Sequence, residues 1–118
     1  MSFVVVHQQN TKFFDSVSVT ASTSSTPINI NSYSLYAIQH VWSGTSGSFQ
    51  IIVEGSNFET TDPDYFTVID ITNVTATNSP KGNRIVNVEK AGYAFVRVRI
   101  LFTSGGGTLT SLLNGKVL

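Results

Sequence analysis

Apolar and polar residues alternate along much of this chain with a period of two, which is typical of β-strands that bury one face. The clearest case is the segment 94–102, where Val98 and Ile100 point to one face and Arg97 and Arg99 to the other. We expect the valine and isoleucine in the core and the arginines on a half-covered outer face. Truncating an arginine should therefore destabilise the fold less than truncating its apolar neighbours.

Eight segments show this kind of pattern, while Ser, Thr and Gly interrupt every window in which a helical stripe could develop. The predicted strands cover residues 3–7, 13–20, 34–42, 48–54, 65–71, 83–89, 94–102 and 108–113. Their spacing predicts one all-β domain over residues 1–118, an antiparallel two-sheet β-sandwich of about seven to eight strands. Jelly-roll-like and immunoglobulin-like topologies both fit.

Two Gly/Ser segments are predicted to close hairpins, because glycine adopts the positive φ angles that tight turns need. They cover residues 43–48 and 103–108, and a third turn is expected at 78–83. A phosphate-binding loop is a poorer interpretation of the glycines. Neither segment is followed by a Lys-Ser/Thr pair or by a helix N-terminus that would hold an anion.

The composition changes the picture of the surface. Of the 118 residues 41% are hydrophobic, only 12% are charged, and the formal net charge is +0. So little charge gives a solitary protein weak protection against association, so we expect this one to contact other proteins, as a homo-oligomer or in many symmetric copies. Seven scattered Lys and Arg residues do not form the basic patch of a nucleic-acid binder. No apolar run is long enough for a membrane span.

The residue types that carry catalysis and metal binding are scarce. His7 and His40 are the two histidines, there is no cysteine, and no recognised nucleophile motif accompanies either ring. We therefore expect no enzymatic activity, no catalytic or metal-ligating residues and no cofactor. The acidic loop Glu59–Asp64 leaves one alternative open. Its carboxylates suit calcium chemically but lack the spacing and glycine of an EF-hand.

Four aromatic residues leave a second alternative open. Trp42, Tyr65, Phe66 and Tyr93 could stack on sugar rings if they were exposed, although core packing is the better interpretation of Trp42. Trp42 ends a strand that is apolar on both faces, so we expect it to close one end of the sandwich. A carbohydrate-binding module is therefore the runner-up to a structural protein.

The stretch from Tyr33 to Lys116 contains four segments in a distinctive order. They are a strand ending at Trp42 before Gly44-Thr45, a strand running into Ser56-Asn57, the strand Tyr93-Ala94-Phe95-Val96-Arg97-Val98, and Gly107-Thr108-Leu109-Thr110 continuing to Gly115-Lys116. This order resembles a family of small bacteriophage virion proteins and phage-borne β-sandwich modules. One departure is clear. The family usually places a Trp soon after the Ser-Asn turn, whereas this chain has the acidic loop followed by Tyr65-Phe66.

The resemblance implies a location more than an activity. It indicates a structural protein of the virion that decorates or cements the capsid or forms an accessory part of the head, neck or tail. Its partners would be other capsid or tail subunits. The alternative within the same resemblance is a carbohydrate- or receptor-binding module of a tail fibre. The start, Met1 to His7, lacks the charged region and long apolar stretch of a signal peptide, so we expect synthesis in the host cytoplasm.

The residues expected to touch such partners lie in two places. Residues 1–30 fall largely outside the resemblance and form either an N-terminal arm or the first strands of the sandwich. They carry apolar, β-prone side chains that must be covered, namely Phe3, Val4, Val5, Val6, Phe13 and Phe14. The second place is the half-covered face of Arg97 and Arg99.

Overall fold

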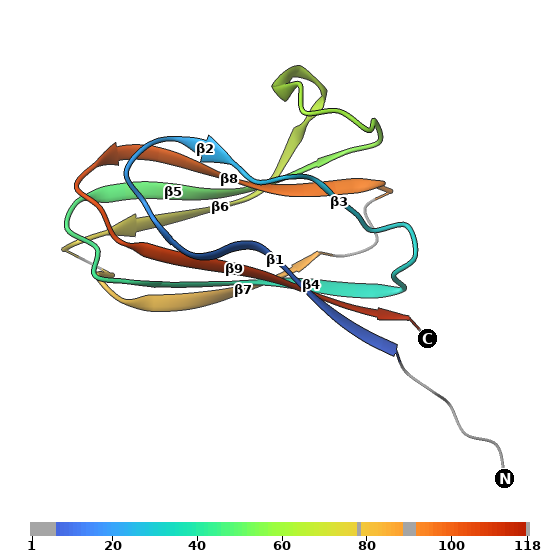
Figure 1. Ribbon diagram of the computed structural model, residues 1–118, viewed down its shortest axis with the longest axis horizontal. Helices are drawn as coiled ribbons and strands as arrows, with labels where there is room; N and C mark the ends of the chain where they lie inside the picture. Colours follow the sequence, from blue (N-terminus) through green and yellow to red (C-terminus); the bar gives the residue numbers. More distant parts are fainter. Residues whose placement is uncertain (1–6, 78, 89–91, 118) are drawn as a thin grey trace, which may run out of the picture.

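The computed structural model describes residues 7–77, 79–88 and 92–117, and they form two antiparallel β-sheets packed face to face (Figure 1). The strands are β1 (His7–Ser18), β2 (Thr23–Ser24), β3 (Ile28–Asn29), β4 (Leu35–Ser43), β5 (Ser48–Ser56), β6 (Thr67–Thr75), β7 (Gly82–Val88), β8 (Phe95–Ser104) and β9 (Thr108–Val117). One turn of 3-10 helix, η1 (Pro63–Tyr65), lies between β5 and β6. No helical segment in the described ranges approaches the length and hydropathy of a membrane span.

The order of the strands is that of a jelly roll. One sheet has the order β1-β9-β4-β7, and the other has the order β2-β8-β5-β6, with β3 also pairing with β8. If β2 and β3 are taken as one interrupted strand, every connection except that from β5 to β6 crosses from one sheet to the other. The predicted β-sandwich is confirmed, and of the two topologies that fit the sequence, the strand order matches the jelly roll.

The strand count exceeds the predicted seven or eight because the edge beside β8 is broken in two. Pro27 lies between β2 and β3, and proline has no N–H to give to a strand ladder. The edge continues on either side of it. Ser25 N donates to Val98 O at 2.8 Å, and Ile30 N donates to Ala94 O at 2.9 Å. A strand of two residues on each side of a proline leaves no alternating pattern for the sequence to display.

The two Gly/Ser segments are not hairpins, so that prediction was wrong. Residues 44–47 lead from β4 to β5 and residues 105–107 from β8 to β9, and each pair of strands belongs to different sheets. The two crossings pack against each other at their glycines. A Cβ on Gly47 would overlap the Ser104 carbonyl, and a Cβ on Gly105, where φ is +72°, would overlap the backbone of Gly47. Glycine is needed here because two loop segments of the same chain approach closely, as well as for the turns themselves.

Most of the predicted strand boundaries also move, and the changes at β1 and β6 have clear causes. The predicted strands 3–7 and 13–20 omit residues 8–12, but β1 runs from His7 through these residues, with Thr11 opposite Leu113 of β9. The predicted strand 65–71 begins later, at Thr67, because Tyr65 ends η1. Backbone pairing with β9 holds the polar start of β1 in the sheet, and side-chain alternation does not report such pairing. Phe3, Val4, Val5 and Val6 lie outside the described residues.

The core lies between the sheets and confirms the face assignment of β8. Val98 and Ile100 are 0% and 1% exposed, and Phe14 of β1 joins the same cluster. Trp42 is buried as well. Its ring lies over Gly82, and its indole Nε1 donates to Ser79 O at 2.9 Å, so the polar edge of the ring is satisfied within the fold.

Candidate contact site

The longest loop of the sandwich, residues 57–66, rises from the outer side of the five-stranded sheet (Figure 1). Short polar side chains hold its shape. Ser56 Oγ accepts from Phe58 N at 3.1 Å, Thr60 Oγ1 from Asp62 N at 3.0 Å, and Asp62 Oδ1 from Asp64 N at 3.0 Å. Such side-chain acceptors stabilise turns that have few backbone hydrogen bonds of their own. The loop is therefore built as a structured projection.

Arg97 fastens this loop to the sheet below it. Its guanidinium carbon lies 3.9 Å from the centre of the Phe66 ring, and Nη1 donates to Thr61 O at 3.1 Å. Its Nε donates to Glu54 Oε1 at 3.0 Å, and Arg99 Nε lies 3.2 Å from the same oxygen. A planar cation that stacks on a ring and also bonds to a carboxylate makes a rigid link between loop and sheet.

The two arginines predicted to contact a neighbour therefore differ. The Arg97 side chain is 4% exposed and its contacts lie within this chain, whereas that of Arg99 is 31% exposed. The alternation placed both on the outer face as predicted, but the loop covers the first of them. Of the aromatic pair in β1, Phe14 lies in the core and Phe13 is half-buried against it. The predicted contacts of Arg99 and of residues 3–6 remain predictions.

The crest of the loop carries an exposed aromatic pair. Phe58 and Tyr65 are 61% and 52% exposed, and their ring centres lie 5.1 Å apart with the planes inclined by 56°. Of the four aromatics named as sugar-stacking candidates, only Tyr65 is largely open. Trp42 is buried, Phe66 lies against Arg97, and Tyr93 is half-buried against the core. Phe58 was missed. Its only sequence signal is a large apolar side chain among loop residues.

The acidic residues of the same loop do not converge. Glu59, Asp62 and Asp64 are exposed, and in the described ranges no three acidic or histidine side chains gather closely enough to hold a metal ion. Asp62 is instead engaged as the cap of η1. The loop carboxylates thus have a local structural use in turn formation.

His40 lies in the sandwich core, away from any opening. The ring is fully buried, and its Nδ1 shares a hydrogen bond of 2.7 Å with Ser111 Oγ, its register partner on β9. Burial, with a smaller contribution from Arg84 on the other side, lowers the pKa of His40 to about 4. The ring is therefore neutral near pH 7. Its Nδ1 is paired with Ser111, whereas its buried Nε2 has no hydrogen-bond partner within the described residues.

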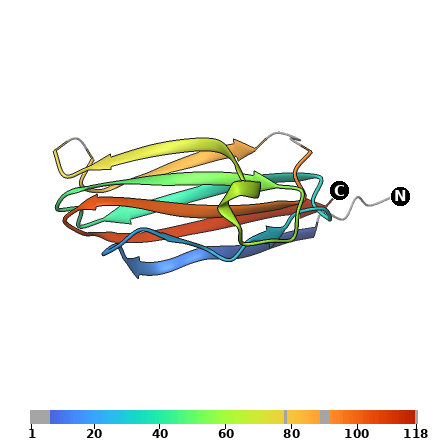
Figure 2. The same ribbon diagram turned by 90° about the horizontal axis from the view of Figure 1, so that it is seen from above.

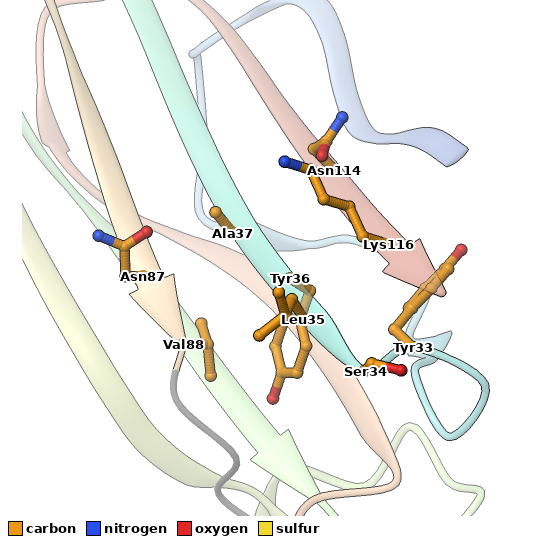
Figure 3. A pocket seen from close by; sticks show the side chains of 9 residues that line it. All are labelled: Tyr33, Ser34, Leu35, Tyr36, Ala37, Asn87, Val88, Asn114 and Lys116. Carbon is orange, nitrogen blue, oxygen red and sulfur yellow. The ribbon is translucent and has the colours of Figure 1, made fainter. Parts of the chain in front are cut away.

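A second feature is an open pocket of about 850 Å³ at the end of the sandwich where β4 begins and β7 and β9 end (Figure 3). It is lined by Tyr33, Ser34, Leu35, Tyr36, Ala37, Asn87, Val88, Asn114 and Lys116. Leu35 is 55% exposed there. Desolvation, followed by the proximity of Tyr93, raises the pKa of Tyr36, so its phenol stays protonated across the physiological range.

Comparison with known proteins bears on the fold. No protein-family model matches this chain, and no curated protein matches it significantly. The crystal structure of the SPBc2 prophage-derived protein YomS superposes on it with a TM-score of 0.60 and 13% sequence identity. The chain is similar in fold to YomS. The superposition covers 98% of this chain and 99% of YomS, so the likeness includes both sheets and not a fragment of the sandwich. At this identity it shows the fold alone.

Proposed function

We propose that the chain is a non-enzymatic structural virion protein of a bacteriophage, a capsid decoration or cement subunit or an accessory subunit of the head, neck or tail. The observation that carries the proposal is the nearly full-length likeness in fold to the prophage-derived YomS. Jelly rolls are common in viral capsid proteins, and this fold-level analogy points in the same direction.

The surface of the sandwich suits a protein that works through protein–protein contacts. Apolar side chains are exposed on the outer sides of both sheets, including Val41 and Ile85 on one and Ile71 and Leu101 on the other. Only 12% of the residues are charged. A neighbouring protein could therefore cover these faces without desolvating many charged groups.

The test is to locate the chain in purified particles by density and by copy number. A decoration subunit should occur in many symmetry-related copies on heads, whereas a neck or tail accessory should occur in few. Particles purified from a producing culture that contain no copy of the chain, while the chain is present in the lysate, would overturn the proposal.

We expect residues 3–6 and Arg99 to take part in attachment. Removing residues 2–6 deletes part of the expected contact and keeps β1 from His7 onward. The deletion should therefore weaken attachment to undecorated particles more than it lowers the melting temperature. Arg99→Ala should act in the same direction. Full occupancy by both variants would remove these residues from the contact.

The alternative is a carbohydrate- or receptor-binding module, and the exposed Phe58–Tyr65 pair on a projecting loop favours it. On this alternative the chain should bind cell-surface glycans, and Tyr65→Ala should abolish that binding. Leu101→Ala, which removes an exposed side chain from the sheet surface, is the matched control. Binding that both variants retain would argue against the loop as a sugar platform.

A further inference from the structure

A jelly roll leaves four edge strands, and unpaired edges invite association unless something protects them. In Figure 2, β6 and β7 run along one side of the molecule, and β1 and β2 along the other. Two of the four edges are poor templates. β1 has two register irregularities and Ser16 in the left-handed region at φ +49°, and β2 and β3 are two residues long each.

A third edge, β6, is occupied by an arginine from the opposite sheet. Arg84 Nη2 lies 2.8 Å from Asp70 Oδ1, and Nη1 donates to the backbone carbonyl of Ile71 at 3.2 Å and to Thr72 Oγ1 at 3.3 Å. A charged side chain that engages a strand carbonyl in the middle of β6 obstructs the approach of another strand.

The fourth edge, β7, has no such protection. Its seven residues pair with β4 without a register irregularity, from Trp42↔Gly82 to Tyr36↔Val88, and no strand in the described ranges pairs with its other side. Ile85, at the middle of the strand, is 57% exposed. A regular edge with an exposed β-branched residue is suited to strand addition.

We propose that β7 pairs in antiparallel fashion with β7 of a second copy of this chain, so that two four-stranded sheets join into one continuous sheet of eight strands. The twofold axis would pass between the two Ile85 residues. This surface goes beyond the proposed function, because it depends on neither a particle nor a host.

The sequence of β7 has the self-complementarity that a twofold interface requires. With Ile85 opposite its own copy, Asn83 lies opposite Asn87 of the other strand, and the outer face reads Asn, Ile, Asn in both directions. Paired amides can exchange hydrogen bonds on either side of the central apolar contact. This register also pairs all seven residues of the strand.

The neighbouring registers are less favourable. A twofold axis perpendicular to a sheet must place a residue opposite its own copy, so the nearest alternatives centre on Arg84 or Val86. Centring on Arg84 would set two arginines against each other, which is destabilising. Centring on Val86 would leave Gly82 and Asn83 without partners within the strand. The Ile85 register is therefore the one we expect.

Sedimentation of the purified full chain from about 1 µM to 1 mM tests the dimer, since a single added strand pair falls at the small end of specific interfaces. The dimer should form within this range, and Ile85→Lys should raise its dissociation constant about tenfold or more by opposing two lysines. Val41→Lys, on the same sheet face but one strand inward, is the control and should leave it nearly unchanged. A chain that stays monomeric throughout, or a dimer indifferent to Ile85→Lys, would overturn the proposal.

The register has a separate test, because the chain contains no cysteine. Directly opposed antiparallel residues have Cα atoms about 4.5–5.5 Å apart, within the range of a disulfide, so Ile85→Cys should cross-link to itself on mild oxidation. Asn83→Cys and Asn87→Cys should cross-link efficiently only when mixed. Cross-linking of Asn83→Cys with itself, or equal cross-linking of Val41→Cys and Ile85→Cys, would contradict the register. None of these outcomes depends on whether the chain belongs to a virion.

Discussion

Glu54 and Arg97 are direct register partners on β5 and β8, and Glu54 Oε1 lies 3.0 Å from Arg97 Nε with both side chains almost fully buried. The pair lies on the outer face of its sheet, which the sequence pattern predicts to be half-covered. Burial comes from the loop above, through Phe66 and the Thr61 carbonyl. The ion pair and the projecting loop are therefore parts of one structural unit.

The first prediction concerns this unit. Arg97→Ala should lower the free energy of unfolding by about 3 kcal/mol, because it leaves the Glu54 carboxylate buried with one partner fewer and frees the loop. Arg99→Ala, at the more exposed end of the same network, should cost about 1 kcal/mol or less. Denaturant unfolding measures both. This revises the expectation from the sequence that both arginines matter little to stability, and equal small losses would restore that expectation.

The second prediction concerns the contact between the two sheet crossings. Gly47→Ala should destabilise the fold by about 2 kcal/mol or more, because the added methyl overlaps the rigid backbone at Ser104. Gly106→Ala is the matched control, since its Cβ would approach only Val19 O, at 3.4 Å. Thermal melting of the two variants side by side gives the comparison. Similar melting temperatures would mean that the crossings separate without cost.

The third prediction concerns pH. The pKa of His40 is lowered from 6.5 to about 4. Between pH 4 and pH 6.5 the imidazole is therefore mostly protonated in the unfolded chain and mostly neutral in the folded chain. The stability associated with His40 is complete above about pH 6.5 and is lost as the pH falls toward 4, on the order of 3 kcal/mol in all. Unfolding free energies measured from pH 4 to 7 should fall more steeply in the parent chain than in His40→Gln. Parallel profiles would contradict the assignment.

The fourth prediction tests the core face of β8. Val98→Ala and Ile100→Ala should each destabilise by about 2 to 4 kcal/mol through lost burial and a residual cavity. Leu101→Ala should change stability by less than about 1 kcal/mol, because this neighbour is 41% exposed on the other face. A larger loss at Leu101 than at Ile100 would invert the faces.

The fifth prediction concerns the acidic loop. The melting temperature should not change on addition of calcium, since the loop carboxylates do not converge on a common point. A rise that disappears in Asp62→Ala or Asp64→Ala would make the loop a cation site.

Much of this architecture follows from local pattern. Alternation in β8 assigned Val98 and Ile100 to the core, where both are buried. Alternation of buried and exposed residues is a property of a single strand, so the neighbouring residues in the sequence are enough to predict it. The β-sandwich could be predicted for the same reason.

Which strands pair, and what covers their outer faces, was decided by the tertiary structure. Glycines such as Gly47 and Gly105 occur both in hairpin turns and in loops that cross between sheets, so their local chemistry does not tell a hairpin from a crossing. The packing of the two crossings against each other makes the difference. Likewise Arg97 alternates as a surface residue, and only the loop that folds back with Phe66 makes it a buried one. Residues far apart in the chain form these contacts, and a pattern with a period of two carries no information about them.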